Sequence, residues 1–200
     1  MAADRCAICS DTANEITAAL SKLFQSFKIR PYDYHTGRGW LKSVVIREAV
    51  ATGEVMVVIN GADPVFPAKR TFATALKKAC PSVTTAVYTV NRDRGKLFVG
   101  KQGEILFGSG TITDILCGEK FLLSPSSFYQ INHDQTEQLY QKAIELAALS
   151  GSETVLDAYC GIGTIGIIAS RRAKFVHAVE LNPAAIADAK KNAGLNDIQN

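Results

Sequence analysis

The spacing of apolar side chains divides most of the chain into helical and extended segments. Residues 10 to 27 place Ile16, Leu20 and Phe24 on one helical face, so this segment is predicted to be an amphipathic helix. The same kind of spacing predicts helices at residues 67 to 79 and 135 to 149. Extended apolar runs predict strands at residues 41–49, 54–59, 83–90, 104–107, 111–116 and 120–123.

The order of these predicted elements indicates two domains. Residues 1–125 mix helices and strands, which predicts an α+β layer domain. The segment Ser124-Pro125-Ser126-Ser127 is typical of a domain boundary. Residues 126–200 are then predicted to form a second domain of α/β type.

A strand, a glycine loop, a helix and another strand follow one another in the second domain. Val155 and Leu156 predict a short buried strand, after which Gly161 and Gly163 let the backbone turn tightly and approach a ligand. The next strand ends just before Glu180, whose carboxylate can accept hydrogen bonds from both ribose hydroxyls of an adenosine. This order predicts a nucleotide-binding unit.

Two cofactors fit this unit. Gly161, Gly163 and Gly166 match the dinucleotide fingerprint, and Glu180 follows at about the expected 20 residues. However, Asp157 closes the first strand, and a carboxylate there would repel a pyrophosphate while suiting the ammonium and sulfonium charges of S-adenosylmethionine. We therefore favour S-adenosylmethionine over a nicotinamide dinucleotide. An α/β crossover that binds no ligand is the remaining alternative.

The composition is that of a globular protein. Hydrophobic residues make up 47% of the 200 positions, which is enough for a sizeable core. No apolar run reaches membrane-spanning length and no signal peptide is recognised, so we expect a cytoplasmic protein without a membrane partner. The five cysteines are an odd number and mostly scattered, which argues against a secreted disulfide framework. Cys6 and Cys9 have metal-like spacing, but no second pair completes four ligands, so no metal site is expected.

Charge is unevenly distributed along the chain. Residues 1–101 hold 15 Lys and Arg against 8 Asp and Glu, while residues 102–200 hold 7 against 11. A basic first half suits an anionic macromolecule such as RNA, although solvated helix faces and a hairpin turn explain several of these charges equally well. The candidate RNA contacts are Arg30, Arg38, Lys42, Lys69, Arg70, Lys77, Lys78, Arg92, Arg94 and Lys96, with Tyr32, Tyr34 and Trp40 as possible stacking groups.

Two linked motifs make the interpretation more specific. The segment Ser124-Pro125-Ser126-Ser127-Phe128-Tyr129-Gln130-Ile131-Asn132 is followed, after a predicted helix, by Val155-Leu156-Asp157-Ala158-Tyr159-Cys160-Gly161-Ile162-Gly163-Thr164. The pairing of F-x-Q-x-N with D-x-[FY]-C-G-x-G about 25 residues later is far more selective than a glycine motif alone. Together these segments resemble the RNA uracil-5-methyltransferase family, whose members make 5-methyluridine in ribosomal or transfer RNA. The stretch from Tyr32 to Arg47 is similar to the central domain of that family.

The resemblance implies a cofactor site and a fold. It implies that Gln130, Tyr159 and Glu180 contact S-adenosylmethionine, and that Gly161, Gly163 and Thr164 shape the loop beneath its methionine portion. It also implies a central α+β domain followed by the first part of a Rossmann-like methyltransferase domain, with RNA, most simply 23S rRNA, as substrate. From the residues alone, Gln130 could equally make a structural hydrogen bond before a helix, and Tyr159 could be a half-buried core aromatic.

The family mechanism uses groups that this sequence does not supply. A cysteine thiolate attacks uracil C6 and a carboxylate removes the C5 proton; in the family both lie beyond the region that ends here at Asn200. The resemblance therefore implies a chain truncated at both ends and inactive by itself. Cys160 lies in the cofactor loop and is expected to be a small buried residue. Some members carry an iron–sulfur cluster, and Cys6 resembles its last ligand, but the other ligands would precede residue 1.

Truncation has an expected consequence for folding. Ile165, Ile167, Ile168 and Val179 are predicted to lack part of their cover, so the incomplete sheet is a possible surface for self-association. Two other functions remain open. One is a methyltransferase for another acceptor, and the other is a non-catalytic RNA-binding fragment that keeps a relic of the cofactor loop.

Overall fold

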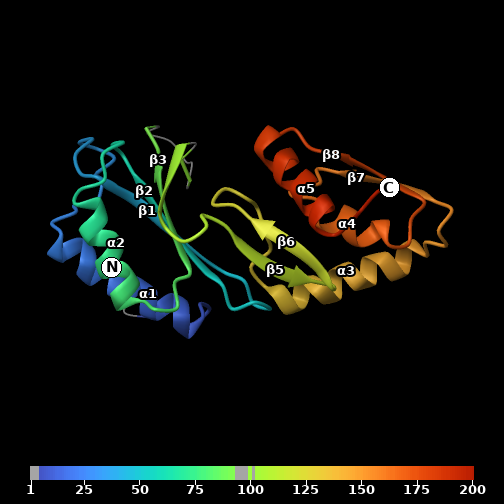
Figure 1. Ribbon diagram of the computed structural model, residues 1–200, viewed down its shortest axis with the longest axis horizontal. Helices are drawn as coiled ribbons and strands as arrows, with labels where there is room; N and C mark the ends of the chain where they lie inside the picture. The colour runs from blue at the N-terminus through green and yellow to red at the C-terminus, as the bar shows by residue number, and fades with distance from the viewer. Residues whose placement is uncertain (1–4, 93–98, 101) are drawn as a thin grey trace. The chain divides into compact units, whose positions relative to one another are not determined.

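The computed structural model describes residues 5–92, 99–100 and 102–200 and divides into two compact units. The first unit spans Met1–Glu48 and Glu54–Ile112, and the second spans Ala49–Gly53 and Thr113–Asn200. In Figure 1 the first unit is blue to green and the second mainly yellow to red. Among the described residues, no helix combines the length and the apolar character needed to cross a bilayer.

A four-stranded sheet forms the frame of the first unit, in the order β1-β2-β3-β4. The parallel pair β2 and β3 is joined through α2, while the outer pairs β1–β2 and β3–β4 are antiparallel. Both helices pack on one face of this sheet (Figure 1). The elements are α1 (Asp11–Ser26), β1 (Leu41–Glu48), β2 (Val55–Gly61), α2 (Lys69–Ala79), β3 (Thr85–Val90) and β4 (Gln102–Phe107).

The helical pattern seen in the sequence produces the core of this unit. Ser10 caps α1 by accepting a hydrogen bond from the Ala13 N–H at 2.9 Å. Ile16, Leu20 and Phe24 then face the sheet and are all buried. Burial of one such side chain contributes roughly 1.5–3 kcal/mol, so the predicted apolar face of α1 is what fixes the helix on the sheet.

The second unit contains a hairpin, a helix and a parallel βαβ crossover. Strands β5 and β6 form one two-stranded sheet, and β7 and β8 form another in which the strands are parallel and α4 is the connection. This crossover is the start of the Rossmann-like arrangement that the glycine loop predicts. The elements are β5 (Ile112–Leu116), β6 (Glu119–Leu123), α3 (His133–Ala147), β7 (Thr154–Ala158), α4 (Thr164–Ser170), β8 (Phe175–Val179) and α5 (Pro183–Leu195).

Side-chain amides and ions attach the hairpin to the crossover. Asn192 Oδ1 accepts from the Leu122 N–H at 2.8 Å, and Asn196 Oδ1 accepts from the Lys120 N–H at 2.8 Å. Arg171 donates to both carboxylate oxygens of Glu119 at 2.7 Å. These contacts attach β6 to α5, so the hairpin belongs to the second unit. The chain divides between Ile112 and Thr113, whereas the sequence predicted a boundary at residue 125.

The prediction that Val155 and Leu156 form a buried strand is wrong for Leu156, whose side chain is 66% exposed. Successive side chains of a strand point to opposite faces, and α4 packs on the face that carries Asp157, leaving Leu156 on the open face.

Only some of the apolar side chains that were predicted to be partly uncovered are exposed. Ile167 and Ile168 are buried, whereas Val179 is 56% exposed. Self-association through the exposed side chains of this sheet stays a prediction.

Candidate functional site

The candidate site lies where β7 and β8 end. Both strands are parallel and in register, with Ala158 opposite Val179, so the residues that follow them emerge at the same edge. Tyr159 begins the glycine loop after β7, and Glu180 directly follows β8. The topology therefore brings together two segments that the sequence separates by a helix.

Glu180 is held in place by backbone donors from both sides. The Gly161 N–H donates to Oε2 at 3.0 Å, and the Asn182 N–H donates to Oε1 at 2.8 Å. The hydrogen bonds from Asn182 and Gly161 hold the pKa of Glu180 below its usual value. The carboxylate is thus ionised and fixed, and each oxygen keeps a lone pair for a further donor.

The glycine loop adopts conformations that favour glycine. Gly161 has φ +57°, and a Cβ added there would meet no atom within 4 Å. Gly163 has φ +84° and caps α4; its added Cβ would lie 3.3 Å from Ala189 Cβ. Gly161 therefore leaves free space at the surface, whereas Gly163 allows the close packing of α4 against α5.

Tyr159 is the unusual member of the loop. It has φ +63°, a left-handed conformation that costs a residue with a Cβ roughly 1–2 kcal/mol. Its side chain is 89% exposed, so its interpretation as a half-buried core aromatic is wrong. A strained backbone that presents an aromatic ring to solvent is typical of ligand sites.

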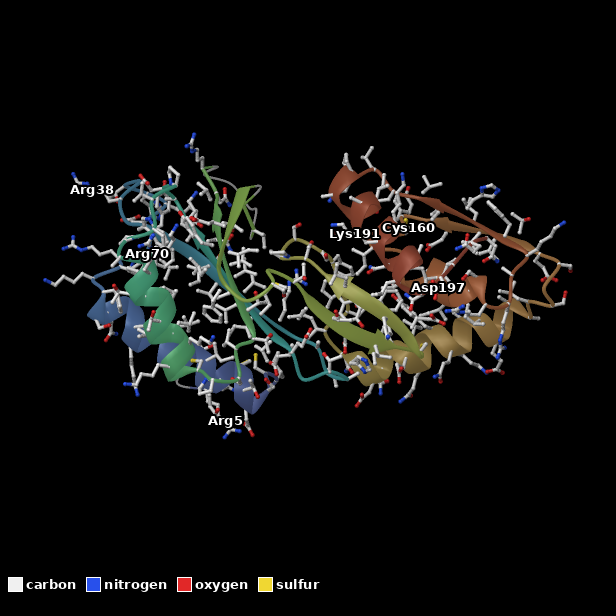
Figure 2. All side chains as sticks on the ribbon, viewed as in Figure 1. Arg5, Arg38, Arg70, Cys160, Lys191 and Asp197 are labelled. Carbon is white, nitrogen blue, oxygen red and sulfur yellow. The ribbon has the colours of Figure 1, made fainter. Side chains whose placement is uncertain are left out.

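Three polar side chains lie within or next to the glycine loop. Asp157 is buried, and its Oδ2 accepts from the Gly166 N–H at 2.9 Å; burial raises its pKa against the effect of this bond. Cys160, labelled in Figure 2, is buried as expected, and burial and Asp157 raise the pKa of its thiol. Thr164 Oγ1 lies 3.3 Å from the hydroxyl of Tyr140 on α3.

No family model matches this chain. It is 42% identical over 197 residues to an uncharacterized RNA methyltransferase of Halalkalibacterium halodurans, covering 98% of this chain and 43% of that protein. It is 39% identical over 199 residues to an uncharacterized RNA methyltransferase of Caldanaerobacter subterraneus, covering 98% of this chain and 44% of that protein. Over almost its whole length, the chain is thus similar to proteins named as RNA methyltransferases.

The chain is also similar to a solved methyltransferase structure. The crystal structure of Pyrococcus abyssi tRNA (uracil-54, C5)-methyltransferase in complex with S-adenosyl-L-homocysteine matches with a TM-score of 0.82 and 26% identity. The match covers all of this chain and 48% of that one, so the chain spans less than half the length of the relatives it matches. The Rossmann-like methyltransferase fold class is thereby confirmed.

The F-x-Q-x-N segment connects β6 to α3. Asn132 caps α3 by accepting from the Gln135 N–H at 3.2 Å, so the helix-capping role belongs to Asn132. Ser127 donates to Asp188 on α5 at 3.0 Å, which ties the segment to the crossover. Gln130 is exposed between these two anchors, and its contact with a cofactor stays a prediction.

Leu181 was not singled out from the sequence. It directly follows Glu180, and its side chain is 92% exposed. A single exposed leucine is common on protein surfaces. Here Tyr159 is also exposed, at the end of the neighbouring strand, so exposed apolar side chains follow both strands near the carboxylate of Glu180. The signal that could have identified Leu181 is its position beside the acidic residue.

An apolar cavity of about 370 Å³ lies between α4, β8 and α5, reaching Glu180 at one end. Val176, Ile186 and Ala193 line it, so most of its wall suits hydrocarbon and not a ribose. The polar part of the candidate site therefore lies outside this cavity, at the carboxyl ends of β7 and β8. Among the described residues, no group of three or more His, Cys, Asp or Glu side chains could hold a metal ion.

The aromatic and basic residues predicted to contact RNA have different environments in the first unit. Trp40 is not an exposed stacking group, because it stacks on Tyr88 at 5.1 Å and donates its indole N–H to the Val65 carbonyl. Lys69 is paired with Glu104, while Lys77, Lys78, Arg30, Arg38, Arg70 and Arg92 are exposed. Arg94 and Lys96 lie outside the described residues.

Proposed function

We propose that the chain is the cofactor-binding part of an S-adenosylmethionine-dependent methyltransferase that modifies uridine C5 in RNA, with 23S rRNA as the expected target. The observation that carries the proposal is the fixed carboxylate of Glu180 beside the open glycine loop. Sequence relatives named as RNA methyltransferases supply the reaction class. The uracil-C5 position is suggested by the Pyrococcus abyssi enzyme.

The residues at the strand edge fit S-adenosylmethionine. The free lone pairs of Glu180 suit the two ribose hydroxyls, and the open space at Gly161 admits a ligand close to the backbone. Leu181 and Tyr159 offer apolar surface to the adenine, and Gln130 can donate and accept near the amino acid portion. The cofactor supplies an electrophilic methyl group when it is bound.

The contribution of this chain is to bind and orient. Glu180 is ionised and already hydrogen-bonded, so little ordering is needed when a ribose arrives. Cys160 is buried and burial raises the pKa of its thiol, so we assign the attack on uracil C6 to a different cysteine of the proposed methyltransferase. The general base for the C5 proton is assigned there as well.

Calorimetric titration with S-adenosylhomocysteine tests the cofactor assignment. We expect the wild-type chain to bind, Glu180→Ala to bind about tenfold more weakly or worse, and Gln130→Ala to bind more weakly. Glu145→Ala removes an exposed carboxylate from α3 and is expected to bind like the wild type. No binding by the folded wild type, or equal binding by Glu180→Ala, would overturn the cofactor site.

The uracil-C5 assignment needs a separate measurement on the proposed methyltransferase. RNA carrying tritium at uridine C5 releases the label to water when C5 is substituted, because the C5 proton is lost. Methylation of a ring nitrogen or a ribose hydroxyl leaves this label in place. Cofactor-dependent tritium release is expected, and methyl transfer to RNA without release would assign a different acceptor.

A further inference from the structure

Two tyrosines of the loop that precedes β1 lie close to a lysine at the start of that strand. The rings of Tyr32 and Tyr34 meet edge to face, with centroids 5.1 Å apart and an interplanar angle of 82°. Lys42 Nζ lies 4.7 Å from the Tyr32 centroid and 6.0 Å from that of Tyr34. Tyr34 is 51% exposed, so half of its surface faces solvent although the loop holds it in place.

Backbone hydrogen bonds hold this loop closed. The Asp33 N–H donates to the Arg38 carbonyl at 2.7 Å, and the Gly37 N–H donates to the Asp33 carbonyl at 2.8 Å. At the base of the loop, the Tyr32 N–H donates to the Leu41 carbonyl at 2.7 Å. The loop is thus ordered before any ligand binds, which reduces the entropy cost of binding.

Gly39 closes the loop tightly. It has φ +102°, and a Cβ there would lie 2.0 Å from the Pro31 carbonyl oxygen, so a larger residue would not fit. This close approach fixes the turn that leads into β1, and it keeps the tyrosines next to Lys42.

The charges around the tyrosines favour an anion. Arg38 is exposed and points outward from the loop in Figure 2, and Arg30 is exposed just before the loop. The one nearby carboxylate within the loop, Asp33, accepts from the His35 and Thr36 N–H groups at 2.8 and 3.3 Å. Its charge is therefore directed to loop amides, while the guanidinium groups remain open to solvent.

We propose that Tyr34, supported by Tyr32 and Lys42, is a stacking site for an unpaired nucleotide of the RNA substrate, with Arg38 contacting the adjacent phosphate. The inference rests on the proposed RNA substrate. A stacked base meets the open face of Tyr34, and such stacking contributes about 1–3 kcal/mol per base. Paired RNA hides its base faces, so the site selects single-stranded segments.

Fluorescence anisotropy with a labelled single-stranded RNA tests the site. Tyr34→Ala is expected to weaken binding about tenfold with an unchanged salt slope, because no charge is removed, while Tyr34→Phe binds like the wild type. Arg38→Gln is expected to weaken binding and to reduce the salt slope by about one. Ile8→Ala, at an exposed apolar position of the same unit, is the control and leaves binding unchanged.

A crosslink on the wild-type chain tests the site without any substitution. RNA with 4-thiouridine in an unpaired segment is irradiated, and the attached peptide is identified by mass spectrometry. Attachment within residues 31–38 is expected. Attachment only elsewhere, equal binding by Tyr34→Ala, or no RNA binding at all would overturn the site, while S-adenosylhomocysteine calorimetry judges the cofactor half independently.

Discussion

Gly161 donates its backbone N–H to Glu180 Oε2 at 3.0 Å, which joins the loop after β7 to the residue after β8. The bond makes loop conformation and carboxylate position depend on each other. Binding of a ligand to Glu180 therefore also depends on the conformation at Gly161. Substitutions in the loop should change ligand affinity and the free energy of unfolding to different degrees.

Alanine at the two loop glycines separates these effects. Gly161→Ala adds a Cβ in open space with φ +57°, so it should cost about 1 kcal/mol of stability and weaken S-adenosylhomocysteine binding about tenfold. Gly163→Ala meets Ala189 and Ile167 at 3.3 Å in addition to its strained φ, so it should cost about 2 kcal/mol or more. Urea unfolding and calorimetry measure both quantities, and the reverse order of stability losses would contradict this account of the loop.

Asp157 gives a test of cofactor charge. Its buried carboxylate supports the loop, and S-adenosylmethionine carries a sulfonium charge that S-adenosylhomocysteine lacks. Asp157→Asn should therefore weaken S-adenosylmethionine binding by roughly fivefold more than S-adenosylhomocysteine binding. Equal weakening of both ligands would mean that the carboxylate acts only on loop structure.

The stability of Asp157→Asn should depend on pH. Burial raises the folded-state pKa of Asp157, so its contribution to stability is fully present below the unfolded pKa of about 3.9 and is lost as pH rises through the folded pKa. Asparagine does not ionise and can still accept from the Gly166 N–H. The variant is expected to be more stable than the wild type at pH 7 and to lose this advantage near pH 3.5, as measured by urea midpoints. If the variant exceeded the wild type in stability by more near pH 3.5 than at pH 7, the sign of this pH dependence would be wrong.

Asn192 connects the hairpin, the glycine loop and α5. It is fully buried, accepts from the Leu122 N–H at 2.8 Å and donates to the Ile162 carbonyl at 3.1 Å. Asn192→Ala leaves these groups without their partner, so it should lower the free energy of unfolding by about 2–4 kcal/mol. Lys191→Ala, at the exposed neighbouring position, should change it by under about 0.5 kcal/mol. A loss for Asn192→Ala no larger than that of the control would show that the amide does not hold the unit together.

Local pattern predicted most of the secondary structure. The apolar spacing of Ile16, Leu20 and Phe24 identified α1, and the glycine loop followed by Glu180 identified the βαβ crossover, because these signals depend on neighbours in sequence. The position of Glu180 at the end of β8 follows from the same local order.

What the sequence did not predict depends on distant contacts. Trp40 packs partly buried against the core because Tyr88, far along the chain, stacks on it. The hairpin belongs to the second unit because Asn192 and Asn196 bond to it across 70 and 76 residues. Tyr159 is exposed and has a left-handed backbone, and a sequence pattern reveals neither. The cofactor contact of Gln130 stays a prediction.

The measurement that tests the cofactor site most directly is a titration of the ¹⁵N-labelled chain with S-adenosylhomocysteine, followed through backbone amide shifts. We predict that the largest shifts occur at Gly161, Gly163 and Leu181, at the ends of β7 and β8, and that Glu180→Ala strongly reduces them at a ligand concentration that half-saturates the wild type. Shifts confined to other parts of the chain, or none in the folded protein, would contradict the proposed site.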